Sequence, residues 1–155
     1  MENRFENASD EVKELVENVI DNSFRELRNA KILVLFDCKK RISKGKMVMG
    51  RMQKTNDLLR HLTLDNTMDE DGYDYILYLD KMIITNIQEE DQIRIIRHEL
   101  QHAEVDYDSN KPYKLRDHEI SDFYDEIEFN SDDARWGVRI ASIGHDMYEQ
   151  EADRD

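Results

Sequence analysis

The sequence predicts an α+β domain in which a small antiparallel or mixed sheet packs against an N-terminal helix and a central helix, with further helices towards the C-terminus. Three observations support this prediction. Apolar residues recur at three- and four-residue intervals in several segments, as in amphipathic helices. Short β-rich runs lie between these segments. The chain has 155 residues with one Pro and five Gly, which is typical of one domain, residues 1–155, with few irregular loops.

The N-terminal segment is expected to form a helix that begins after Ser9, because Ser can accept a hydrogen bond from the first turn of a helix. Helical spacing relates the apolar residues that follow: Val12, Leu15, Val16, Val19, Ile20, Phe24 and Leu27. Lys31 to Phe36 is short and apolar on successive residues, which favours a buried strand.

A basic run, residues 39–46, follows that strand. Gly45 allows a turn within it, so we expect a solvated hairpin turn, with a patch for acidic partners as the alternative. Met47 to Met52 resumes an extended pattern that can pair with the strand before it. The polar stretch 55–72 then contains a cluster with helical spacing, formed by Leu58, Leu59 and Leu62.

A further strand and the central helix come next. Tyr73 to Leu79 alternates side chains on two partly apolar faces, which is typical of a strand. Asn86 and Glu89 resemble a capping box, so the helix is expected to begin there and to run to about Val105. Its predicted apolar back holds Ile93, Ile96, Leu100 and Ala103, and its predicted solvated flank holds Arg94, Arg97, Gln101 and Glu104.

The C-terminal third is predicted to be helical after a polar loop. That loop, residues 106–114, contains Pro112, the only Pro. Asp117 can cap a helix with the apolar residues Ile120, Phe123, Tyr124 and Ile127. A last helix over about residues 131–151 is expected to supply core residues: Trp136, Val138, Ile140, Ile143 and Met147.

The central helix carries the most informative motif, His98-Glu99-Leu100-Gln101-His102. Residues four apart lie on one face of a helix, so both imidazoles can reach one metal ion at ~2.0–2.1 Å. Glu99 lies about 100° further round the helix, beside such an ion, where it can polarise a water molecule. This is the H-E-x-x-H arrangement of zinc metallopeptidases. The alternative is a pair of surface histidines on a charged helix.

A catalytic zinc needs a third protein ligand. Four residues after the loop are candidates: His118, Glu119, Asp122 and Glu126. His118 is favoured, because the loop can bring it over the two motif histidines and because imidazole is a strong zinc donor. Asp122 is a replacement ligand or an acceptor that orients an imidazole. His61 and His145 have no comparable partner and are expected to be surface residues.

Composition argues against several classes of function. The net charge of −14 opposes contact with phosphate backbones and anionic membranes, so direct nucleic-acid binding is not expected. Cys38, the single Cys, cannot form an internal disulfide or a thiolate zinc site and indicates a reducing compartment. Neither a membrane-spanning stretch nor a secretory signal after Met1 is recognisable. We therefore expect a cytoplasmic protein.

Several segments together resemble one family: Phe24-Arg25-Glu26-Leu27 with Ala30-Lys31-Ile32, Tyr75 to Leu79, Arg97 to Ala103, His118 to Phe123, and Trp136. Through them the chain is similar to the phage metallopeptidases, zincin-like domains related in style to SprT-like and IrrE-like proteases. The resemblance implies a single zincin-like domain, residues 1–155, with zinc held by His98, His102 and His118 and with Glu99 as the catalytic residue. SprT-like proteins act on proteins crosslinked to DNA, whereas this chain is strongly acidic.

The expected function is zinc-dependent hydrolysis of peptide bonds in a protein or peptide substrate, with Glu99 as the general base. The substrate is expected to pair with a sheet edge at Tyr73 to Leu79. Four residues are candidates for stabilising the oxyanion: Tyr107, Tyr113, Arg116 and Tyr124. Two alternatives remain, a catalytically silent zincin-fold binding or sensor protein and an acidic DNA mimic that acts as a decoy for host DNA-binding proteins.

Overall fold

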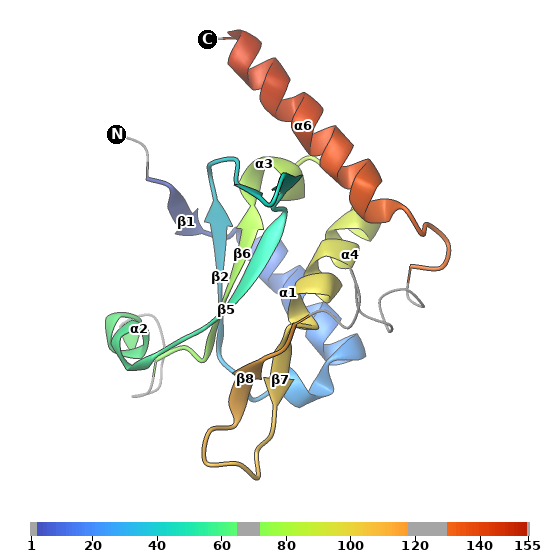
Figure 1. Cartoon of the computed structure of the whole chain (residues 1–155). Coiled ribbons are helices and arrows are strands. Elements are labelled where there is room, and N and C mark those ends of the chain that lie inside the picture. The colour runs from blue at the N-terminus through green and yellow to red at the C-terminus, as the bar shows by residue number, and fades with distance from the viewer. Residues whose placement is uncertain (1–2, 65–71, 118–129, 155) are drawn as a thin grey trace.

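The structure is a computed structural model that describes residues 3–64, 72–117 and 130–154. In chain order its elements are β1 (Phe5–Asn7), α1 (Asp10–Ser23), the 3₁₀ turn η1 (Arg25–Leu27), β2 (Ile32–Asp37), β3 (Ile42–Ser43), β4 (Lys46–Met47), β5 (Gly50–Lys54), α2 (Asp57–Leu62), β6 (Tyr75–Asp80), α3 (Lys81–Ile84), α4 (Glu89–Leu100), β7 (Ala103–Val105), β8 (Tyr113–Leu115) and α6 (Trp136–Arg154). The predicted α+β class is confirmed (Figure 1). Within the described ranges, no helix is long and apolar enough to cross a membrane.

The main sheet is mixed and has the strand order β1-β2-β6-β5. β2 and β6 run parallel, and the two outer strands are antiparallel to their neighbours. Two sequence expectations are therefore wrong. Residues 47–52 do not pair with β2, because the β3–β4 hairpin first turns the chain and β5 then pairs with β6. Tyr73 to Leu79 does not form a sheet edge, because β6 lies between β2 and β5; the edge next to β6 is β5.

One face of this sheet packs against α1 and α4; in Figure 1, α1 passes behind the strands and α4 lies to the right of β5. Strand alternation places the buried side chains of β2, β5 and β6 on that face: Val34, Phe36, Met52, Tyr75, Leu77 and Leu79. α1 begins after Ser9 as predicted, and Ser9 Oγ accepts a hydrogen bond from Val12 N–H at 3.3 Å. It ends at Ser23 rather than at Leu27, which lies in η1.

The central helix α4 differs from the prediction at both ends. Gln88 precedes it without a side-chain hydrogen bond, and Asn86 donates instead to Met82 O at 2.7 Å, so no capping box forms. α4 ends at Leu100 rather than near Val105, because residues 103–105 form β7 and pair with β8. The predicted solvated flank is wrong at two positions, since Arg94 and Gln101 are buried.

The C-terminal helix α6 begins at Trp136, five residues later than predicted. Trp136 and Ile140 are buried in the common core, as expected, whereas Val138 is 62% exposed. The helix predicted after Asp117 lies outside the described residues. α2 forms over the predicted Leu58, Leu59 and Leu62 cluster, but it buries none of its residues.

Candidate active site

The two motif histidines lie at the C-terminal end of α4. His98 is in its last turn, and His102 lies just beyond it, where Gln101 keeps a helical backbone (φ −63, ψ −22) and His102 N–H donates to Glu99 O at 3.1 Å. The centroids of the two rings are 5.7 Å apart. Imidazoles that share one tetrahedral zinc at ~2.0–2.1 Å have their centroids roughly 5–6 Å apart. The end of α4 therefore brings both rings to a separation that suits one ion.

The backbone of Arg116, the residue that follows β8, holds the His102 ring in place. His102 Nδ1 lies 2.8 Å from Arg116 O, and Arg116 N–H donates to His102 O at 2.8 Å. A ring nitrogen that faces a carbonyl carries the proton, so Nε2 of His102 offers the lone pair for a metal. The Arg116 guanidinium donates from Nε to Gln101 O at 2.6 Å and from a terminal nitrogen to the Gln101 side chain. Arg116, one of the oxyanion candidates, thus fixes the segment that carries His102.

Trp136 packs against the His98 ring at a centroid distance of 5.9 Å and an interplanar angle of 62°. Trp136 is 6% exposed and begins α6. The indole thus limits the positions that the His98 ring can take. The sequence assigned Trp136 to the core through its helical spacing, but a contact between residues 38 positions apart has no local signal.

Glu99 lies on the side of α4 that faces β5. It is 8% exposed, and burial raises the pKa of its carboxyl to about 8. A cation held by the neighbouring histidines would lower this pKa again. A Cβ atom built on Gly50 would lie 2.9 Å from Glu99 Cγ and 3.1 Å from Tyr78 O. Because residue 50, at the start of β5, is a glycine, the Glu99 side chain can pack directly against the backbone of the edge strand.

The β7–β8 hairpin is anchored to the sheet by Tyr75. Its buried hydroxyl donates to Lys114 O at 2.9 Å, lies 3.1 Å from Glu104 O and accepts from Lys114 N–H at 3.0 Å. Tyr113 packs edge-on against Tyr75 at 5.7 Å, and Tyr107 packs edge-on against Tyr113 at 6.1 Å. Two of the oxyanion candidates thus belong to an aromatic group that supports this hairpin, which the sequence did not indicate.

Asp91 of α4 forms one buried ion pair within its own helix and a second, half-exposed pair with α6. Asp91 accepts from Arg94 at 2.7 Å and from two nitrogens of Arg139 at 2.6 and 2.7 Å. Arg139 also donates to Asp133 at 2.8 Å. These hydrogen bonds explain why Arg94 is buried on the flank that the sequence predicted to be solvated.

His118, the predicted third ligand, lies outside the described residues, as do Glu119, Asp122, Glu126 and the oxyanion candidate Tyr124. Over the ranges that the structure describes, no group of three or more His, Cys, Asp or Glu side chains could hold a metal ion. The identity of the third ligand therefore stays a prediction. His61 and His145 lie on the surface as expected, and His145 pairs with Glu149 at 3.1 Å.

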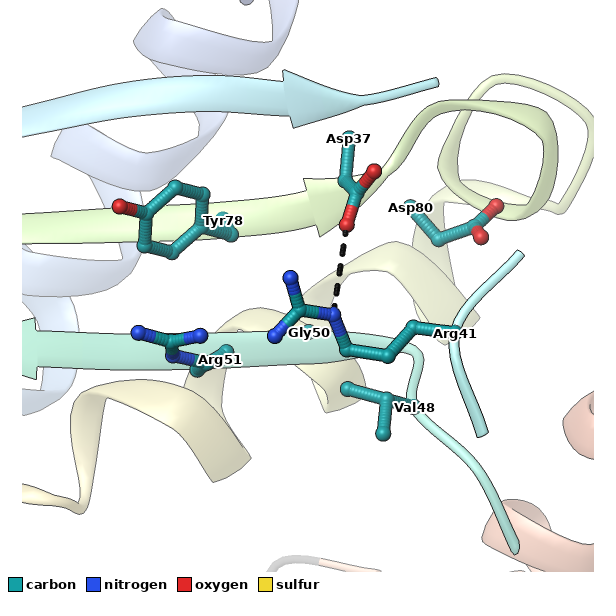
Figure 2. Close-up of a pocket in the computed structure, with 7 residues that line it drawn as sticks. All are labelled: Asp37, Arg41, Val48, Gly50, Arg51, Tyr78 and Asp80. Carbon is teal, nitrogen blue, oxygen red and sulfur yellow. Dashed lines mark ion pairs between the residues drawn. The ribbon is translucent and has the colours of Figure 1, made fainter. Parts of the chain in front are cut away.

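A small hollow adjoins the site across β5 (Figure 2). It lies where the parallel strands β2 and β6 end, at the paired residues Asp37 and Asp80. Figure 2 shows Arg41 reaching towards Asp37, with an Nε–O distance of 3.7 Å. Gly50 lines this hollow and also lies against Glu99, so the two regions meet at one residue of β5.

These features define a small α+β domain with an H-E-x-x-H motif at the end of α4. Its second histidine, His102, is held by Arg116, the residue that follows the β7–β8 strand pair. The chain belongs to the family described as Putative phage metallopeptidase, whose model matches residues 3–147. The resemblance inferred from the sequence is thereby confirmed. The family description indicates a peptidase with a metal cofactor. No curated protein and no solved structure matches the chain.

Proposed function

We propose that this protein is a zinc-dependent endopeptidase of the zincin type. His98, His102 and His118 would hold the ion, and Glu99 would act as the general base. The adjacency of the two motif rings, with His102 Nδ1 turned to a carbonyl, is the observation that carries the proposal. The family description supports the reaction class, and the buried carboxyl of Glu99 beside the two rings supports the assignment of the base.

The described residues fit a zinc ion in their chemistry. Imidazole nitrogens are preferred zinc donors, and the tautomer of His102 is set by its backbone partner. When bound, zinc would supply Lewis-acid chemistry, lowering the pKa of water towards ~7 and polarising the scissile carbonyl. Glu99 would take the proton from this water and pass it to the leaving amine. Its burial keeps bulk water away from this transfer.

The substrate backbone would pair with the outer edge of β5. Asp80 N–H donates to Met49 O, and Thr55 N–H donates to Asp74 O. Met49 with Asp80 and Thr55 with Asp74 are therefore hydrogen-bonded pairs at the two ends of the β5–β6 ladder. Such pairs alternate along an antiparallel ladder, so the N–H and C=O groups of Gly50, Met52 and Lys54 point to the outer edge. A peptide added there would pass Gly50, beside Glu99, and its binding would need little sequence preference.

Metal content and hydrolysis together test this function. We expect purified parent protein to hold one zinc ion and to cleave unfolded protein substrates. Glu99→Gln should keep the zinc and lose about 100-fold or more in rate, because it removes the general base. Glu99→Gln protein that cleaves as fast as the parent would contradict the role of Glu99. Zinc retention without any hydrolysis by the parent would favour a silent binding protein.

The third ligand is tested by metal titration of His118→Ala. We expect zinc affinity to fall strongly in this variant and to stay unchanged in His145→Ala, the matched surface control. Unchanged affinity in His118→Ala would transfer the role to one of the acidic alternatives, Glu119, Asp122 or Glu126. Zinc binding that survives His98→Ala would overturn the whole site.

A further inference from the structure

We propose that the edge of β5 and the adjoining hairpin select acidic polypeptide segments as substrates. The inference rests on the proposed function, because it names the substrate class of that site. It starts from the uneven distribution of charge along the chain. Residues 38–56, here called the basic segment, hold seven of the 22 Lys and Arg residues and none of the 36 Asp and Glu residues. The rest of the chain has 15 basic and 36 acidic residues, a net charge of −21.

The fold places the basic segment around the proposed cleavage site. The segment forms the β3–β4 hairpin and then the edge strand β5, which begins at Gly50, the residue that lies against Glu99. Five of its basic side chains are exposed: Lys39, Lys44, Lys46, Arg51 and Lys54. Along a peptide paired with β5 at Gly50, Arg51 and Lys54 would follow in one direction of the strand and the hairpin lysines in the other. Strand alternation puts Arg51 and Lys54 on opposite faces of the sheet.

Arg51 is positioned to contact the side chains of such a peptide. Strand alternation puts Arg51 and Gln53 on the sheet face away from the core, opposite Tyr78 and Ile76. The Arg51 guanidinium lies over the Tyr78 ring at 5.2 Å and donates to Gln53 Oε1 at 3.0 Å. A guanidinium has five N–H donors, so it can bind a carboxylate in addition. Side chains of neighbouring strands lie about 4.5–5.5 Å apart at Cβ, within reach of this contact.

The nearby acidic groups do not cancel these charges. Asp37 lies within 3.1 Å of Arg4, which belongs to another part of the chain, and 3.7 Å from Arg41. Asp80 accepts from Ile83 N–H at 2.9 Å and from the Tyr148 hydroxyl at 2.6 Å. Both carboxylates are buried, so the exposed surface of the hairpin and of β5 is basic.

An acidic polypeptide fits this surface better than other polyanions. The outward N–H and C=O groups of β5 pair with a peptide backbone, which nucleic acid does not have. A long polyanion would also meet the net charge of −21 on the rest of the molecule, whereas a short peptide stays near the basic segment within a Debye length of about 8 Å. For a second copy of this chain to occupy the surface, it would have to present an acidic extended strand to β5.

Binding to full-length Glu99→Gln protein tests the proposal without requiring hydrolysis. Two labelled peptides of equal length are compared by fluorescence anisotropy, one with Glu and one with Gln at alternate positions. We expect the Glu peptide to bind about ten-fold more tightly at low salt, with the preference falling as salt rises. Adding Arg51→Glu and Lys54→Glu should abolish the preference. The matched control, Lys13→Glu with Lys111→Glu, changes net charge equally at sites outside the basic segment and should keep it.

The other outcomes are distinct. Equal affinity for both peptides, or equal loss in the two double variants, would overturn the proposal. An oligonucleotide that displaces the Glu peptide with higher affinity, or self-association that the Arg51 and Lys54 changes abolish, would assign the surface to another partner and overturn it as well. Acidic preference in binding with no cleavage by zinc-loaded parent would instead overturn the proposed function. Cleavage without a preference for the Glu peptide would leave the proposed peptidase function intact and overturn only the preference for acidic segments.

Discussion

Gly50 is the residue at which the sheet meets the candidate site. Its missing side chain leaves room for both Glu99 Cγ and the carbonyl oxygen of Tyr78. Most sequence positions at which a strand begins tolerate a side chain. The requirement for glycine here comes from the approach of α4 to the edge strand.

Gly50→Ala should lower activity more than stability. The added Cβ would lie 2.9 Å from Glu99 Cγ, and the Glu99 side chain can move more easily than the Tyr78 backbone. We expect kcat to fall about ten-fold or more, because small displacements of a general base are costly. The free energy of unfolding should fall by about 1–2 kcal/mol, measured by urea denaturation. Gly137→Ala, where a Cβ would meet nothing within 4 Å, is the control. A ten-fold loss there too would contradict this explanation.

At this scale the sequence predicted that the motif residues lie together but not the contacts that support them. His98, Glu99 and His102 follow from helical spacing alone, since residues four apart share a face. The Arg116 carbonyl behind His102 and the indole beside His98 depend on how distant segments pack. Arg116 is a candidate for stabilising an oxyanion, and its guanidinium donates to Gln101 in the structure. Side-chain type suggests a role, but the partner is fixed by tertiary structure.

At the scale of elements, α4 is held against α6 by the carboxylate of Asp91. The largest effect on the pKa of the Asp91 carboxyl is the hydrogen bond from Arg139, which lowers it. Burial raises this pKa, and the hydrogen bond from Arg94 lowers it further, so the pKa lies below its ordinary value. A carboxylate with a lowered pKa stabilises the folded state above the unfolded pKa of about 3.9. This stabilisation is lost as the pH falls through the folded pKa.

Asp91→Asn should therefore destabilise the protein in a pH-dependent way. We expect a loss of about 2 kcal/mol at neutral pH, since two arginines would each lose one of their charged acceptors. Urea denaturation at about pH 7 and about pH 3 should show a smaller difference between parent and variant at the acidic pH. Asp21→Asn, which removes an exposed ion pair with Arg28, should change little at either pH. A pH-independent gap for Asp91→Asn would assign the effect to packing rather than charge.

The β7–β8 hairpin depends on Tyr75 in a comparable way. Tyr75→Phe removes a buried hydroxyl that contacts Lys114 and Glu104, which should cost about 1–3 kcal/mol. Because Arg116, directly after β8, contacts the His102 ring, zinc affinity should fall as well, measured by competition with a chelator dye. Tyr107→Phe removes a hydroxyl from a residue that is 49% exposed and serves as the control. Zinc affinity that is unchanged in Tyr75→Phe would separate the hairpin from the metal site.

Sequence patterns predicted most elements but not their pairing. The strands β2 and β6 and the helices α1 and α4 follow from apolar periodicity, and Ser9 marks the start of α1. The end of α4 was placed five residues too late, because Ala103 to Val105 continues the helical pattern while its backbone pairs with β8. The position of β5 at the edge likewise depends on the β3–β4 hairpin, whose effect on topology is not local.

At the scale of the whole molecule, α1, α4 and α6 share one core with the sheet. We infer that residues 1–155 fold as one cooperative unit. The chain provides an internal probe of this inference, because Trp136 is its single Trp and lies in that core at the start of α6. Its fluorescence therefore reports on the junction of α4 and α6, whereas far-UV circular dichroism reports on all helices.

Urea unfolding followed by both signals should give one coincident transition. Zinc at 100-fold above its Kd should stabilise the folded state by about 2.7 kcal/mol, because only the folded chain brings the ligands together. In His98→Ala the zinc-dependent shift should vanish while the two signals still coincide, since the metal site is lost but the core is kept. Separate transitions would mean that α6 unfolds on its own. An equal zinc shift in His98→Ala would place the ion elsewhere, because the ring beside Trp136 is then not a ligand.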